Sequence, residues 1–151
     1  MGGHKSVIRL EEITPANWRL GLKVSEAQAH CVSSSAGLLA RAYAFRQNRS
    51  NAYVIYNGSI PIGMALYYDC DERNAYDFSQ FFIDERYQGK GFGLEAARQI
   101  LERMEHDGKF DKVILCYIDG NEAAKKMYEK LGFHLTGERD EDEIIMEKQL
   151  R

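Results

Sequence analysis

The sequence predicts an α/β domain, of the α+β kind, with elements in the order β-α-α-β-β-β-α-β-α-β-β. Short apolar or alternating runs indicate about seven strands. Apolar residues that recur at helical spacing indicate about four helices. A glycine-rich turn joins a predicted strand to a predicted helix in the middle of the chain. No linker rich in Ser, Gly or Pro divides residues 1–151, so we expect a single domain.

The first elements are a strand and two helices. Residues 7–12 alternate apolar and polar side chains, as a strand does. Thr14 and Pro15 then offer an N-cap followed by proline at the first helical position, which predicts a helix over 15–30 with Trp18, Leu22 and Ala29 on its apolar side. A cluster of serines at 33–35 marks a break before a second helix over 35–47.

A hairpin and a third strand follow. Asn57 and Gly58 both tolerate positive φ, so the pair predicts a tight type I′ turn between strands at 53–56 and 60–68. A polar connection leads to a strand at 76–84, whose aromatic residues suit a pleated surface. The central part of the chain is therefore expected to be an antiparallel meander.

The second half alternates strands and helices. Leu94, Ala97 and Leu101 recur at helical spacing, so a helix is expected over 91–107, ended by Gly108. The remaining elements are expected at 113–118 (strand), 121–131 (helix ended by Gly132), 133–138 (strand) and 143–150 (strand).

Composition and charge exclude several classes. The net charge of −3 argues against a general nucleic-acid binder, which needs a basic face. No apolar run approaches the length of a membrane span, and no secretory signal is recognisable, so a soluble cytoplasmic protein is expected. Cys31, Cys70 and Cys116 lack the spacing of a disulfide framework or zinc site. The four histidines are also too scattered for a metal site, so none is expected.

The glycine-rich turn is the sharpest local feature. Residues 88–93 read Gln-Gly-Lys-Gly-Phe-Gly and lie where a predicted strand ends and a predicted helix begins. Helix N-termini present unpaired N–H groups and partial positive charge, and glycines let a pyrophosphate approach them closely. The turn therefore indicates an anion site, although a structural turn would need the same residues.

Two motifs together resemble a known family. Residues 81–93, FFIDERYQGKGFG, resemble the acetyl-CoA-binding segment of the GNAT superfamily of N-acetyltransferases. Residues 121–133, NEAAKKMYEKLGF, resemble its second conserved block, a helix that ends in Tyr-x-x-x-Gly-Phe. The resemblance is strongest to bacterial spermine/spermidine acetyltransferases. It implies the GNAT fold, a mixed, twisted sheet flanked by helices, over essentially the whole chain.

The resemblance also implies a coenzyme site. In this superfamily the amides of the glycine-rich loop hold the pyrophosphate of acetyl-CoA, and the pantetheine arm lies like an extra strand in a splay between two strands. An asparagine at the start of the second motif contacts the arm. The cofactor-binding residues implied here are Phe82, Ile83, Asp84, Gln88, Gly89, Lys90, Gly91, Phe92, Gly93, Asn121 and Tyr128.

The resemblance makes Tyr128 the acid that protonates the departing thiolate, a role that a phenol of pKa ~10 can fill at neutral pH. An amine acceptor also needs a proton acceptor, since alkylamines are protonated at pH 7. Some polyamine acetyltransferases carry a carboxylate where this chain has Ser79 and Gln80. Asp77, on the same predicted strand face as Ser79, and Glu26 are the candidate bases, acting through water, although taken singly each fits a solvated surface carboxylate better.

The expected acceptor is a polyamine such as spermidine or spermine, and the resemblance implies a homodimer. Carboxylates at Asp69, Asp71 and Glu72 and within 138–143 either flank an amine entrance or lie in solvated loops, and the second group fits a solvated loop better. Another small amine, an aminoglycoside or a protein N-terminus are alternative acceptors. A module that binds acetyl-CoA without turnover is an alternative of another class.

Overall fold

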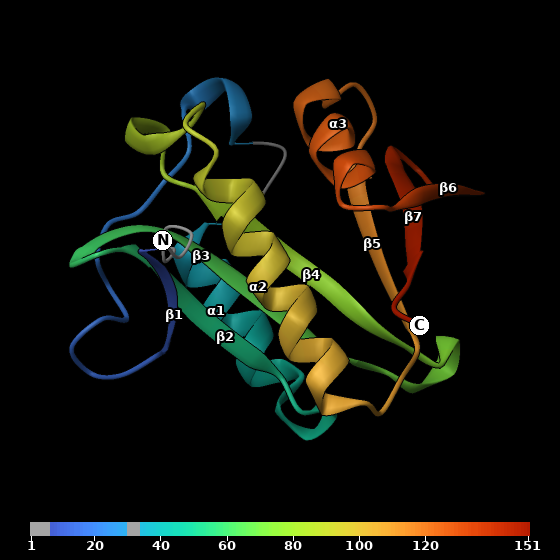
Figure 1. Ribbon diagram of the computed structural model, residues 1–151. Coiled ribbons are helices and arrows are strands. Elements are labelled where there is room, and N and C mark those ends of the chain that lie inside the picture. The colour runs from blue at the N-terminus through green and yellow to red at the C-terminus, as the bar shows by residue number, and fades with distance from the viewer. Residues whose placement is uncertain (1–6, 30–33) are drawn as a thin grey trace, which may run out of the picture.

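The computed structural model describes residues 7–29 and 34–151, which contain one mixed, seven-stranded sheet (Figure 1). The strand order is β1-β2-β3-β4-β5-β7-β6, and of the neighbouring pairs β4 and β5 alone run parallel. The strands are β1 Ile8–Glu12, β2 Asn51–Asn57, β3 Ile60–Cys70, β4 Ala75–Ile83, β5 Lys112–Ile118, β6 His134–Asp140 and β7 Glu143–Gln149. The fold class and the seven strands expected from the sequence are confirmed.

Helices cover both faces of the sheet. The described residues contain three α-helices: α1 Ser35–Ala44, α2 Phe92–Asp107 and α3 Glu122–Lys130. Leu38 of α1 is buried in one apolar cluster, whereas Ile100 and Met104 of α2 belong to another on the opposite face. Short 3-10 turns occur at η1 Glu26–Gln28, η2 Arg46–Asn48, η3 Asp71–Arg73 and η4 Glu85–Tyr87.

The α-helix predicted over 15–30 is wrong. Asn17 is buried, and its side chain accepts from the Thr14 amide (2.7 Å) and donates to the Glu12 carbonyl (2.9 Å). Such side-chain bonds compete with helical ones. Gly21 has a φ of 71°, in the left-handed region, which interrupts a helix. The segment is a loop with turns at 15–19 and at η1, and its predicted end at residue 30 lies outside the described residues.

Within that loop, Leu22 is buried as expected, but Trp18 is 47% exposed, so the predicted apolar side does not form. The predicted break at 33–35 is described from residue 34 onward, where the Ser34 hydroxyl caps α1 by accepting from the Gly37 amide (3.0 Å). The second predicted helix is thus confirmed as α1. Cys31 lies outside the described residues.

The hairpin between β2 and β3 is confirmed, but its turn is shifted by one residue. Asn57 pairs with Ile60, which leaves Gly58 and Ser59 as the turn. Of these described residues, Gly58 has a positive φ of 62°, while Asn57 and Ser59 do not. A type I′ turn needs positive φ at both central residues, so that prediction is wrong.

The parallel pair opens into a splay. β4 and β5 are in register at Tyr76 with Val113 and at Asp77 with Ile114, and beyond these positions they diverge. In Figure 1 they separate toward the end where α2 begins and α3 lies. The splay that the resemblance implied is therefore present, and it divides the sheet beside the glycine-rich turn.

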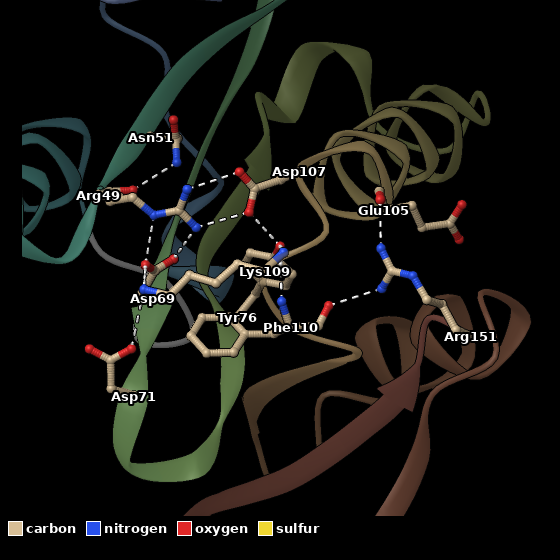
Figure 2. Close-up of polar contacts among 10 residues, drawn as sticks. All are labelled: Arg49, Asn51, Asp69, Asp71, Tyr76, Glu105, Asp107, Lys109, Phe110 and Arg151. Carbon is tan, nitrogen blue, oxygen red and sulfur yellow. Dashed lines mark hydrogen bonds and ion pairs between the residues drawn. The ribbon is translucent and has the colours of Figure 1, made fainter.

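A polar clamp closes the opposite end of α2 (Figure 2). Arg49 donates to both oxygens of Asp69 (2.7 and 3.0 Å) and to both oxygens of Asp107 (2.9 Å each). Lys109 donates to Asp69 (2.8 Å), and the Tyr76 hydroxyl donates to Asp107 (2.5 Å). Asp69 is only 4% exposed, so it lies within the clamp rather than at an entrance. The clamp fixes the end of α2 against the sheet.

Candidate active site

The larger of two adjoining cavities is a cleft of about 450 Å³ along the splay. Its walls come from the end of β4, the glycine-rich turn, the start of α2 and one side of α3. Of the residues that the resemblance implied, those lining it are Phe82, Ile83, Gln88, Gly89, Gly91, Phe92, Gly93, Asn121 and Tyr128. The side chains of Asp84 and Lys90, also implied, do not line it.

The start of α2 presents free backbone donors to the cleft. Gly89 and Gly91 have φ values of 78° and 83°, which a residue with a side chain adopts rarely. The amides of Phe92, Gly93 and Leu94 belong to the first helical turn and have no acceptor in the described chain. A Cβ on Gly93 would lie 3.4 Å from Ile83, so the helix start packs closely against β4. These amides suit an anion.

Asp84 anchors the turn and the preceding loop. It is 1% exposed and accepts from the Arg86 side chain (2.8 Å) and from the Arg86 and Lys23 amides (3.0 Å each). Burial would raise the pKa of Asp84, but these hydrogen bonds outweigh it and lower that pKa. The Asp84 amide itself donates to Ile62 (2.7 Å). Asp84 therefore holds the loop against the cleft, which the sequence did not indicate.

Lysine is the only charged residue type that lines the described part of the cleft. Lys126 and Lys130 lie along α3, and no carboxylate is among the lining residues. The sequence analysis did not identify these two lysines as cleft residues. Their spacing of four residues, on a predicted helix that begins with the motif residue Asn121, was a signal that places them on one side of that helix. The cleft thus favours an anionic occupant.

The second cavity, of about 220 Å³, is more polar. Phe81, Asn121, Ala124 and Tyr128 line both cavities, so the two adjoin there. The polar and ionisable side chains that line only the second are Arg41, Tyr68, Asp77, Ser79, Gln80, Cys116, Tyr117 and Glu143. They come from α1, β3, β4, β5 and β7, so no local motif could have indicated them together.

Asp77 lies half-buried in this second cavity. Burial raises its pKa to about 6; the charges of Arg41 and Arg73 offset part of this effect, and that of Glu143 adds to it. Its carboxylate has no hydrogen-bond partner in the described chain, so it is available to a ligand or water. Glu26, the other candidate base, is exposed in η1 and lines neither cavity.

Tyr128 stands where the cavities meet. It is 8% exposed and packs edge-on against Phe78 and Phe133, with ring centroids 6.4 and 5.8 Å apart. Burial raises its pKa to about 12, and its hydroxyl has no hydrogen-bond partner among residues 7–29 and 34–151. With this pKa, the Tyr128 phenol carries a proton throughout the physiological pH range.

Asn121 caps α3, since its side-chain oxygen accepts from the Ala124 amide (3.2 Å).

Glu143 corrects part of the expectation for 138–143. Glu138 does lie on the surface, paired with Arg73 (2.8 and 3.0 Å). Glu143, however, opens β7 opposite Ile118 and lines the second cavity. The solvated-loop interpretation is therefore wrong for Glu143, because strand pairing places it beside the cavity.

Comparison with known proteins agrees with this geometry. Residues 16–133 match the sequence model of the Acetyltransferase (GNAT) family. The chain belongs to the GNAT family. A relative from Bacillus subtilis (strain 168), the spermine/spermidine N(1)-acetyltransferase, is 34% identical over 102 residues. That match spans 63% of this GNAT chain and 66% of the relative, just under two thirds.

Solved GNAT structures share the fold. The spermidine N-acetyltransferase from Vibrio cholerae, in complex with CoA and spermine, has a TM-score of 0.78 at 19% identity and 97% coverage of both chains. An aminoglycoside acetyltransferase in complex with coenzyme A has a TM-score of 0.77 at 18% identity and 94% coverage of both. Proteins with different named acceptors thus match almost equally, so the fold does not select the amine.

Residues 7–29 and 34–151 contain neither a helix able to span a membrane nor a cluster of side chains able to hold a metal ion. No helix in this part of the chain is both long and apolar enough to cross a membrane. Within 7–29 and 34–151, no group of three or more His, Cys, Asp or Glu side chains is arranged to hold a metal ion.

Proposed function

We propose that this GNAT protein transfers the acetyl group of acetyl-CoA to a primary amine of a polyamine such as spermidine or spermine. One observation carries the proposal: a cleft suited to an anion and a polar cavity with carboxylates meet at the buried hydroxyl of Tyr128. A direct transfer needs donor and acceptor held side by side, and two cavities that meet at a proton donor provide this.

The cleft fits the coenzyme in charge and shape. Free amides at the start of α2 suit its pyrophosphate, and the splay between β4 and β5 gives an extended arm room to lie between two strand edges. When bound, acetyl-CoA supplies an activated acetyl group as a thioester. Phe82 and Ile83 line the cleft along that path.

Two side chains move the protons of the reaction. The amine nitrogen forms a bond to the acetyl carbon as the carbon–sulfur bond breaks. Asp77 accepts the proton that the amine loses, through water, because its pKa of about 6 leaves it mostly ionised at pH 7. Tyr128 donates its proton to the departing sulfur, and the products are the acetamide and free coenzyme.

Direct transfer is favoured over an enzyme-bound acetyl group. The second cavity, called the acceptor cavity from here on because it is proposed to hold the amine, contains Cys116. Among the described residues this is the one thiol that lines it. Burial, reinforced by Glu143 and Asp77, raises the pKa of Cys116 to about 11. At pH 7 it is a thiol rather than a nucleophilic thiolate.

A polyamine is the proposed acceptor for two reasons. Asp77 and Glu143 offer carboxylates in the acceptor cavity, which suit a second ammonium group beside the reacting amine. The Bacillus subtilis relative is named for spermine and spermidine. Arg41 in the same cavity favours a second candidate, an amine that also bears a carboxylate, such as an amino acid.

The test is release of coenzyme thiol from acetyl-CoA with spermidine, spermine, lysine and an aminoglycoside, for wild type and Tyr128→Phe. We expect turnover that prefers polyamines and falls roughly 10²- to 10⁴-fold in the variant. Coenzyme should still bind, because the substitution removes only the hydroxyl and keeps the ring that lines the cleft. Preference for lysine would favour the second candidate. Tight binding of coenzyme without turnover on any amine would reject catalysis in favour of a binding module.

A further inference from the structure

The side of α3 that faces the larger cleft carries positive charge alone. Lys126 and Lys130 are four residues apart, so both lie on one side of the helix, and both line the cleft. Neither has an ion-pair partner in the part of the chain that the structure describes. Lys125 lies on the same helix but lines neither cavity.

This lysine pair is separate from the anion site at the start of α2. Residues from the start of α2 and residues from α3 both line the cleft, and Figure 1 shows these as two separate helices. The first-turn amides of α2 are fixed donors, whereas each lysine is a charge on a flexible stem. One wall therefore suits a phosphate held close to the backbone, and the other suits an exposed phosphate held by charge.

Coenzyme A carries two kinds of phosphate. Each phosphate of its pyrophosphate bears about one negative charge, while its ribose 3′-phosphate is a monoester that bears about −1.5 to −2 at pH 7. The pyrophosphate also carries about two charges in total, but the free amides at the start of α2 already suit it, so the 3′-phosphate is the dianion left for the two lysines.

We propose that Lys126 and Lys130 form a second phosphate subsite that holds the ribose 3′-phosphate of the coenzyme. The proposal rests on the proposed function, because it presumes that coenzyme A occupies the cleft. The subsite makes the protein select coenzyme A over its 3′-dephospho form, and the selectivity falls as ionic strength rises.

The test is calorimetric titration of the whole chain with coenzyme A and with 3′-dephospho-coenzyme A. The proteins are wild type, the double variant Lys126→Gln/Lys130→Gln, and Lys125→Gln as a matched control. Two exposed ion pairs predict a roughly three- to thirtyfold loss of affinity for coenzyme A in the double variant. Affinity for the dephospho form should be unchanged, so the preference disappears, and Lys125→Gln should retain it.

Any result other than this loss of preference would reject the proposed 3′-phosphate subsite. Equal weakening of both ligands would mean that the lysines meet the pyrophosphate. An unchanged double variant would mean that they meet no phosphate. Wild type that binds both forms equally would reject the subsite while leaving the proposed function intact, whereas wild type that binds neither would reject the proposed function as well.

Discussion

The carboxyl of Asp77 predicts how activity depends on pH. Burial raises its pKa to about 6 from the ordinary 3.8. A group of pKa 6 is about nine-tenths ionised at pH 7 and about one-tenth ionised at pH 5, so kcat/KM should fall about tenfold between these values. An Asp with an ordinary pKa would stay almost fully ionised at pH 5, and kcat/KM would hardly change.

The assay measures kcat/KM for spermidine at saturating acetyl-CoA from pH 4.5 to 8, with acetylated product quantified by mass spectrometry because thiol reagents are themselves pH-dependent. In the profile of kcat/KM against pH, Asp77→Asn should lower the plateau near neutral pH and abolish the fall toward low pH, here called the acid limb. Arg41→Gln should move the limb to higher pH, since the Arg41 charge lowers the pKa of Asp77. Glu143→Gln should move it to lower pH, and the exposed Asp71→Asn should leave it in place.

The reasoning fails if wild type keeps its pH 7 value of kcat/KM at pH 5, or if Asp77→Asn keeps the limb. Circular dichroism at pH 5 must show the folded state, so that a fall in rate is not unfolding. A limb that persists in Asp77→Asn would assign the titration to another group.

The same pKa shift bears on stability. Because the folded pKa of Asp77 lies above the unfolded value, its contribution to stability is fully present below pH 3.8 and is lost as pH rises to about 6. The shift corresponds to at most about 3 kcal/mol, and partial solvent exposure reduces this to roughly 1–2 kcal/mol. Asp77→Asn should therefore raise Tm at pH 7 while it lowers kcat/KM, and equal or lower Tm would contradict this assignment.

Two further predictions concern the scaffold. Asp69→Asn removes the negative charge that Arg49 and Lys109 share. Because these cations are half exposed, the free energy of unfolding in urea at pH 7 should fall by about 1–3 kcal/mol. Hydrogen bonds from both cations outweigh burial and lower the pKa of Asp69, so the difference between variant and wild type should shrink as pH falls below about 4. Unchanged unfolding would show that the clamp adds no stability. Gly63→Ala puts a Cβ 2.3 Å from the Phe82 carbonyl oxygen, so it should lower Tm and weaken coenzyme binding at the end of β4, and normal values of both would show that the strands yield there.

Most of the fold follows from local sequence signals. Apolar periodicity and the glycines at 108 and 132 located α2 and α3, because such signals act within a few residues. The predicted helix at 15–30 failed through the local effects of Asn17 and Gly21 and also through distant partners: the Lys23 amide donates to Asp84, and the Lys23 carbonyl accepts from the Glu85 amide. A helix prediction from the pattern alone cannot include such contacts.

The candidate site divides in the same way. The coenzyme residues lie in two contiguous motifs, and most of them line one cleft. The acceptor cavity instead gathers Arg41, Asp77 and Glu143 from separate parts of the chain. Strand pairing brings Glu143 opposite Ile118, a contact that no motif encodes. The roles of Tyr128 and the other site residues stay predictions, as does the homodimer.

The splay makes the sheet incomplete until a ligand fills it. β4 and β5 are in register at two positions only, so beyond them each strand has one edge without a strand partner. Since alternate residues of a strand direct their amides to opposite edges, every second amide near 79–83 and 115–118 faces the gap. Hydrogen exchange resolved by residue should therefore slow with a period of two when coenzyme binds. The bound coenzyme would then protect the backbone as an additional strand between β4 and β5 would.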